Sequence, residues 1–191
     1  MKTEKHRKLT TEKREKKGAR SAKECAYLSA FVALVIAAQI VFSFVPGVEI
    51  VTVLFVAYSL VMGARRAMLS ATAFSLLRQC VFGFFPTVLV LYLVYFNLLA
   101  LCFGWIGLKW RACVKTLPWL VVIACACTVC FTLIDNVITP LWYGYSVEAT
   151  KAYVLASLPF MFPQVVCTAT SVALLLLPLA KVFSLVKKQL F

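Results

Sequence analysis

Long apolar runs fill almost the whole chain after residue 24 and strongly restrict the fold. Hydrophobic residues make up 63% of the sequence and charged residues only 14%, whereas a soluble domain usually has nearer a quarter of its residues charged. This chain has too little polar surface to cover itself in water. At 191 residues we expect a single domain, and we predict an all-α integral membrane protein.

The apolar part divides into six runs, each of which predicts a transmembrane helix. A helix that crosses the hydrocarbon core needs roughly 20 apolar residues, and fewer where neighbouring helices shield its ends. The predicted helices span residues 25–45, 48–63, 67–85, 86–107, 117–138 and 158–186. The sixth contains Pro163 and Pro178, where we expect bends.

The charges between the runs predict the orientation of the bundle. Cytoplasmic loops are enriched in Lys and Arg. Arg65 and Arg66 follow the second run, and further basic residues follow the fourth and sixth runs. The three acids after residue 24 are Glu49, Asp135 and Glu148, and they fall in the alternate connections or at the helix ends next to them. This pattern predicts a six-helix transmembrane bundle, residues 25–191, with cytoplasmic N and C termini.

Residues 1–24 have a different composition from the rest of the chain. They hold ten of the twenty Lys and Arg residues and four of the seven acids, with almost nothing that could build a core. We expect a disordered basic cytoplasmic tail. Attraction to anionic lipid headgroups is a simpler role for such a tail than nucleic-acid binding, so we expect no nucleic-acid partner.

Motifs for catalysis and for metal binding are missing from the sequence. The sole histidine is His6, and no P-loop is present. The eight cysteines lie mostly within apolar runs, and the C-x-x-C of Cys127 and Cys130 has no second ligand pair. We therefore expect no metal, no cofactor and no enzyme. A membrane enzyme is the alternative if Asp135 and Glu148 lie in one cleft within about 10 Å of each other.

Polar and aromatic side chains gather in the half of the bundle that is predicted to face outside. An ionisable residue within a span is costly unless it faces the bundle interior, a cavity or a partner. Aromatic walls with a few fixed polar groups are typical of small-molecule pockets. The candidate substrate-binding residues are Glu49, Arg78, Gln79, Tyr92, Tyr95, Asn97 and Gln164.

Several of these residues also have a plainer interpretation. Glu49 suits the first turn of a helix, where the macrodipole favours an acid. Arg78 suits snorkelling to the outer headgroups. Gln164 suits hydrogen bonding to backbone freed by Pro163. Asp135 suits the end of the fifth helix without contact to a ligand.

A stripe of small residues runs along the first predicted helix. Ala26, Ala30, Ala33 and Ala37 recur at spacings of four, three and four, which places them on one face. Small residues let helices approach closely within a membrane. The stripe therefore predicts an interface with another membrane subunit, with packing inside the bundle as the alternative.

Taken together, these features resemble the substrate-binding S components of energy-coupling factor (ECF) vitamin transporters. The matching parts are the alanine stripe and the segments "PGVEIVTVLFVAYSLVMGARRA", "VFGFFPT", "YLVYFN", "YVLASLPFMFPQVV" and "LLLLPLAKVF". The resemblance covers about residues 25–190. This chain differs from the family pattern at Gly47, Arg78, Met161 and Gln164.

The resemblance implies a function. S components are six-helix bundles of the prokaryotic plasma membrane that bind a vitamin or a similar micronutrient from outside. They work with a membrane coupling subunit and two ATPases, which would supply the missing P-loop, and they deliver the ligand by toppling in the membrane. Their alanine stripe contacts the coupling subunit, and the matching residues here are Ala26, Ala30, Ala33 and Ala37. The alternative is a small membrane scaffold or accessory subunit without a ligand.

Overall fold

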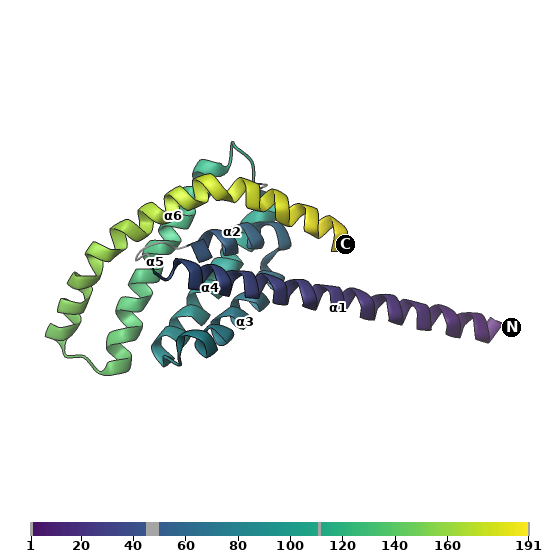
Figure 1. Cartoon of the computed structure of the whole chain (residues 1–191), viewed down its shortest axis with the longest axis horizontal. Helices are drawn as coiled ribbons and strands as arrows, with labels where there is room; N and C mark the ends of the chain where they lie inside the picture. Colours follow the sequence, from purple (N-terminus) through teal and green to yellow (C-terminus); the bar gives the residue numbers. More distant parts are fainter. Residues whose placement is uncertain (1, 45–49, 111, 191) are drawn as a thin grey trace.

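The computed structural model describes the backbone of residues 2–44, 50–110 and 112–190, and the side chains of residues 22–189 within these ranges. This part of the chain consists of helices joined by short connections and contains no strand, which confirms the predicted all-α fold (Figure 1). The helices are α1 (Lys2–Phe42), α2 (Ile50–Met62), α3 (Ala64–Phe82), α4 (Pro86–Lys109), α5 (Leu117–Tyr143) and α6 (Val147–Leu190).

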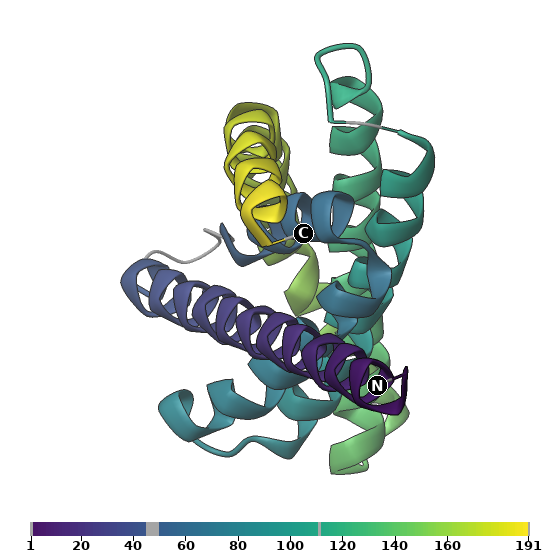
Figure 2. The ribbon, with the colours of Figure 1, turned by 90° about the vertical axis from the view of Figure 1, so that its right-hand side faces the viewer.

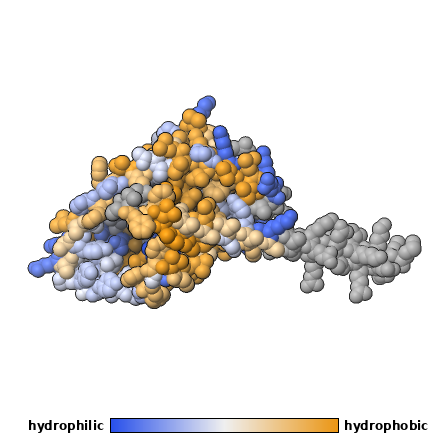
Figure 3. Space-filling view, viewed as in Figure 1, coloured by the Kyte–Doolittle hydropathy of each residue, from blue (hydrophilic) through white to orange (hydrophobic). Residues whose placement is uncertain are grey.

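Four helical segments are long and apolar enough to cross a membrane. They are Ala22–Phe42, Pro86–Lys109, Leu117–Tyr143 and Val147–Gln189. Large apolar side chains on α5 and α6 are exposed, among them Leu141 and Leu174. Figure 3 shows hydrophobic residues over the middle of the body and hydrophilic residues toward its ends. Because a soluble monomer rarely exposes so much apolar surface, the chain is a membrane protein.

Helix α2 lies in the core of the bundle and is not a long span. It has 13 residues, fewer than the roughly 20 that cross the hydrocarbon core. Every side chain from residue 51 to residue 60 is buried, because α2 packs against α1, α3, α4 and α6. Neighbouring helices therefore shield α2, which explains why a helix this short and apolar is tolerated.

Aromatic rings hold the core helices together. Phe31 of α1 stacks on Tyr58 of α2 with ring centroids 3.8 Å apart, and Phe183 of α6 meets the edge of both rings. Phe55 of α2 lies 4.9 Å from Phe96 of α4, measured between centroids. Such pairs contribute about 0.5–1.5 kcal/mol each beyond the burial of their area.

Two glycines let α4 approach the junction between α2 and α3. A Cβ atom at Gly107 would lie 2.3 Å from the carbonyl oxygen of Leu60, and one at Gly104 would lie 2.4 Å from the backbone nitrogen of Ala64. No other residue fits at this distance without separating the helices.

The connection between α5 and α6 is much shorter than predicted. The sequence predicted a long loop between residues 138 and 158, but α5 continues to Tyr143 and α6 begins at Val147. Gly144 ends α5 in the left-handed conformation with φ of 63°, and the Ser146 hydroxyl accepts a hydrogen bond from the Ala149 backbone N–H at 3.2 Å. These two caps let helical structure continue right up to the turn from both sides. The aromatic and charged residues of this segment had indicated a longer loop.

Helix α6 is the longest helix and is curved in Figure 1. Its 44 residues include Pro159, Pro163 and Pro178. At 1.5 Å per residue, a helix of this length extends about 66 Å, well beyond the roughly 30 Å hydrocarbon core. Each proline removes a backbone hydrogen bond and favours a bend, which is how the helix follows the rest of the bundle.

Helix α1 extends back to Lys2, through the segment that was predicted to be disordered. Figure 1 shows this part projecting away from the bundle. Lys, Glu and Arg are good helix formers, so a helix established by the apolar segment after residue 24 continues into them. The predicted turn at Pro46 and Gly47, and Glu49 after it, lie outside the described residues.

The bundle has two ends of different character. The turns at residues 83–85 and 144–146 lie at the same end in both ribbon views, and we call it the turn end (Figures 1 and 2). The opposite end is basic. There, Arg66 forms an ion pair with Glu24 at 3.1 Å, and the Lys187 ammonium donates a hydrogen bond to the Val61 carbonyl.

Candidate functional site

Arg78 lies near the turn end of α3 and has no counter-charge among the described residues. Its guanidinium carbon is 4.8 Å from the ring centroid of Phe82 and 4.5 Å from that of Tyr92. Its Nε and Nη1 atoms are buried and have no hydrogen-bond partner in the described part of the chain. A buried charged donor without a partner is destabilising, so this arginine is a candidate for binding something from outside the chain.

Gln39 of α1 extends this group across the bundle. Its amide nitrogen donates a hydrogen bond to the Tyr92 hydroxyl at 3.3 Å, while its amide oxygen is buried without a partner among the described residues. We call Gln39, Arg78, Phe82 and Tyr92 the arginine cluster. The sequence analysis did not select Gln39, although it is the only polar side chain between residues 30 and 42, and that isolation was an available signal.

Gln79 is next to Arg78 in sequence but is committed to the turn after α3. Its side-chain oxygen accepts a hydrogen bond from the Phe85 backbone N–H at 3.1 Å. The side chain is 7% exposed, and its amide nitrogen has no partner among the described residues. Gln79 therefore orders the start of α4, and the described residues leave both N–H donors of its amide nitrogen unused.

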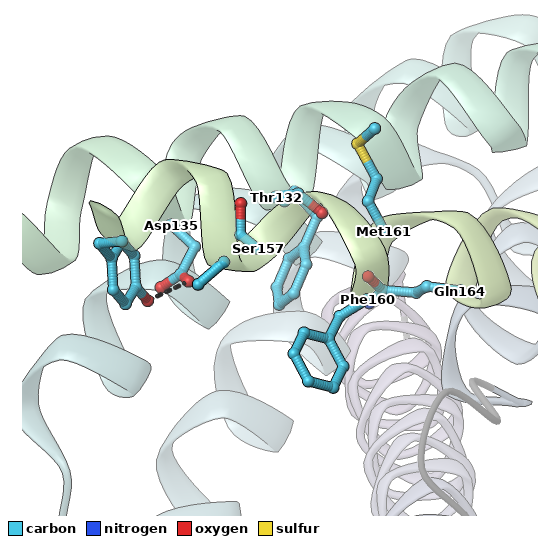
Figure 4. A pocket seen from close by; sticks show the side chains of 9 residues that line it. Thr132, Asp135, Ser157, Phe160, Met161 and Gln164 are labelled. Atoms are coloured by element: carbon cyan, nitrogen blue, oxygen red, sulfur yellow. Dashed lines mark hydrogen bonds between the residues drawn. The ribbon is translucent and has the colours of Figure 1, made fainter. Parts of the chain in front are cut away.

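A second polar group lies between α5 and α6. These helices line an open cavity of ≈ 310 Å³ with both polar and aromatic walls, shown in Figure 4. Its lining residues are Phe131, Thr132, Asp135, Tyr153, Ala156, Ser157, Phe160, Met161 and Gln164. The cavity is about the size of the smaller ligand sites of proteins.

Asp135 is the only ionisable acid or base among the side chains that line this cavity, apart from the phenol of Tyr153. Its carboxylate accepts one hydrogen bond from Thr139 and one from the Tyr153 hydroxyl, both at 2.8 Å. Glu148 does not line the cavity. The carboxylates of Asp135 and Glu148 therefore do not line this cavity together.

Hydrogen bonds between polar side chains continue along the contact of α5 with α6. Asn136 donates to the Ser157 hydroxyl at 3.0 Å, and the hydroxyls of Thr128 and Thr168 are 3.0 Å apart. We call these two pairs the polar seam. In an apolar surrounding such bonds hold helices together. Tyr153, Ser157 and Gln164 are spaced by four and seven residues, so helical periodicity could have identified this face of α6 from the sequence.

An aromatic contact joins the arginine cluster to the cavity. Phe131 lines the cavity, and its ring centroid lies 6.1 Å from that of Tyr92 and 4.8 Å from that of Tyr95. Because Tyr92 also contacts Arg78, one wall of rings separates the lone cation from the cavity that contains Asp135. The two polar groups therefore belong to one region of the bundle.

The predicted binding residues divide accordingly. Arg78 and Tyr92 lie together, Gln164 lines the cavity, and Tyr95 is 3% exposed within the aromatic wall. Asn97 is elsewhere: it accepts a hydrogen bond from Thr72, which precedes Arg78 by six residues or about 9 Å along the helix axis. Glu49 lies outside the described residues.

The alanine stripe points away from the bundle. Ala26, Ala30, Ala33 and Ala37 are all exposed, and Leu34 beside them is 50% exposed. The opposite face of α1 carries the buried residues of this helix. The described side chains therefore leave the stripe uncovered.

The described residues contain no group of three His, Cys, Asp or Glu side chains that could hold a metal ion. No protein-family model, curated protein or solved structure matches the chain. The chemistry of the polar groups is therefore the basis for assigning a function.

Proposed function

We propose that this protein is the substrate-specific subunit of an ATP-driven importer of the ECF type. It would capture a vitamin-like small molecule at the turn end and deliver it inward together with a membrane coupling subunit and two ATPases. The observation that supports this most is the Arg78 guanidinium, which contacts the rings of Phe82 and Tyr92 and has two buried nitrogens without a partner among the described residues. The rings of Tyr92 and Phe131 separate it from a cavity of ≈ 310 Å³. A cation buried in an apolar bundle at this cost is typical of a functional site.

The proposed orientation places the turn end outside the cell and both termini in the cytoplasm of a prokaryotic cell. Arg66, Lys187 and Lys188 lie toward the basic end of the bundle, and cytoplasmic segments are enriched in such residues. All six helices would lie within the membrane, with α2 surrounded by the other helices.

The exposed alanine stripe supports a partner on α1. Helices associate in lipid through small residues that allow close backbone contact, and these four alanines have no such contact within the described bundle. A coupling subunit would cover them. A scaffold without a ligand is less favoured, because it gives no reason for a buried Arg78 that has no partner among the described residues.

Two measurements on the full chain test this proposal. Native mass spectrometry of the purified protein should reveal a bound small molecule. Co-purification with the coupling subunit and ATPases should be lost in the double variant Ala30→Leu and Ala33→Leu, which fills the stripe but leaves ligand binding intact.

Matched control substitutions are Ala149→Leu and Ala152→Leu. These residues have the same spacing and are exposed on α6. They should change neither co-purification nor ligand binding. Equal co-purification of the Ala30/Ala33 variant and the wild type would contradict the proposed partner interface.

A further inference from the structure

We propose that the captured molecule is a small organic anion, a carboxylate or a phosphate, and that Arg78 binds its charge. This inference rests on the proposed function and narrows it to one class of substrate. It follows from the positive charge of Arg78, for which the described residues provide no counter-charge.

The Arg78 guanidinium has aromatic neighbours but unused donors among the described residues. Its carbon lies 4.8 Å from the ring centroid of Phe82 and 4.5 Å from that of Tyr92, and such cation–π contacts favour this position of the group. The N–H groups at the edge are not used: Nε and Nη1 have no hydrogen-bond partner among the described residues. A planar guanidinium with N–H donors that the described residues leave unused suits a carboxylate or a phosphate.

The described part of the chain does not neutralise this charge itself. Asp135 is an acid on the other side of the rings of Tyr92 and Phe131. Its carboxylate accepts hydrogen bonds from the hydroxyls of Thr139 and Tyr153. The ion pair recorded among the described side chains joins Glu24 and Arg66, toward the basic end. An anionic ligand would therefore supply a counter-charge that the described residues do not give Arg78.

Further polar groups in this region fit the same kind of ligand. The amide nitrogen of Gln79 is a further donor on α3 without a partner among the described residues. The buried amide oxygen of Gln39 could accept from a ligand hydroxyl or N–H. The cavity beyond Phe131 adds the neutral groups of Thr132, Ser157 and Gln164. An anion with a neutral polar body matches this set.

A lipid phosphate carries the same chemistry as a soluble organic anion, so the experiment must separate the two sources. The full-length protein is placed in nanodiscs of phosphatidylcholine, which has no net charge. Binding is measured by calorimetry for matched acids and neutral analogues: pantothenate and pantothenol, nicotinate and nicotinamide, biotin and its amide, pyridoxal phosphate and pyridoxal. A parallel sample contains phosphatidylglycerol.

We expect one acid to bind while its neutral analogue binds at least about 30-fold more weakly, because truncating one partner of a buried charged pair costs affinity on this scale. Arg78→Gln should weaken binding of the acid by the same factor and leave the affinity for the neutral analogue unchanged. Arg78→Lys, which keeps the charge without the planar fork, should have intermediate affinity. Arg65→Gln, an exposed arginine at the other end of α3, should bind like the wild type.

The outcomes separate this inference from the proposed function. If a neutral or cationic small molecule binds tightly and Arg78→Gln does not weaken it, the anion assignment is wrong while the importer proposal stands. If no small molecule binds, both are wrong. If phosphatidylglycerol occupies Arg78 and no soluble acid competes, the assignment to a soluble substrate is overturned. Should Arg78→Gln fail to fold, the comparison of acid with analogue on the wild type still decides.

Discussion

Replacing Arg78 with methionine should make the ligand-free protein more stable. Each buried donor without a partner costs about 1–3 kcal/mol, and Nε and Nη1 are both in that state among the described residues. The two ring contacts offset about 0.5–2 kcal/mol each. Methionine keeps contact with Phe82 and Tyr92 through its thioether and removes the buried charge. We expect the free energy of unfolding to rise by about 1–2 kcal/mol, since apolar replacements of buried ionic groups are often stabilising.

The assay is thermal unfolding of the purified protein in detergent without ligand. For a chain of this length, 1 kcal/mol corresponds to about 2–4 °C in Tm, so Tm should rise by about 2–8 °C. The same variant should lose the rise in Tm that a bound ligand gives to the wild type. Arg65→Met, on an exposed residue, is the control and should change Tm little.

A fall in the free energy of unfolding of Arg78→Met by 2 kcal/mol or more, on the order of a lost core contact, would refute this reasoning. Arg78 would then be a structural residue whose contacts with the rings outweigh its missing partners. Arg78 would then no longer support the proposed function, because a residue kept for binding is expected to lower the stability of the ligand-free protein.

Three further predictions concern packing and topology. Gly107→Ala should destabilise the protein by about 1–3 kcal/mol in thermal unfolding, as overpacking usually does, because the new Cβ would meet the Leu60 carbonyl at 2.3 Å. Thr128→Val should lower the free energy of unfolding by about 0.6–2 kcal/mol, the range for hydrogen bonds between membrane helices. The double variant Thr128→Val and Thr168→Val should recover much of that lost stability. Cys113 lies in the connection between α4 and α5, where the hydrogen bond with the Thr116 hydroxyl lowers the pKa of its thiol. A membrane-impermeant maleimide at neutral pH should therefore label it quickly, but only from the cytoplasmic side.

Each of these predictions has a matched control. Leu108→Ala changes an exposed residue beside the tight contact and should leave Tm nearly unchanged, as should Thr170→Val, since Thr170 is exposed on α6. Thr116→Val removes the hydroxyl that lowers the thiol pKa, so less thiolate is present at neutral pH and labelling should slow. Rapid labelling in intact cells, absent from Cys113→Ser, would show that the orientation is reversed.

The sequence predicted the all-α fold and most helix positions because apolar runs and charged breaks follow directly from the cost of exposing polar groups in lipid. It misjudged the connection between α5 and α6. Tyr143, Tyr145 and Glu148 indicated a loop there, and local composition does not reveal that Gly144 and Ser146 cap two helices around a three-residue turn.

The candidate site was only partly predictable. Arg78 was identified because a charge within an apolar run is costly wherever it lies. Its connection to Gln39 and, through Tyr92, to Phe131 depends on how α1, α4 and α5 pack, which no local pattern encodes. Asn97 was selected for the same polar character, but it faces Thr72 on α3, because side chains along one helix point in different directions.

The central claim is that this chain gives an ATP-driven importer its substrate. Uptake of a radiolabelled acid that binds the purified protein should be measured in cells that lack the chain and then express the wild type, the Ala30/Ala33 double leucine variant or Arg78→Gln. The account predicts ATP-dependent accumulation with the wild type only, with binding retained but uptake lost in the leucine variant. Uptake that is the same with and without the chain, or that persists after ATP depletion, would contradict it.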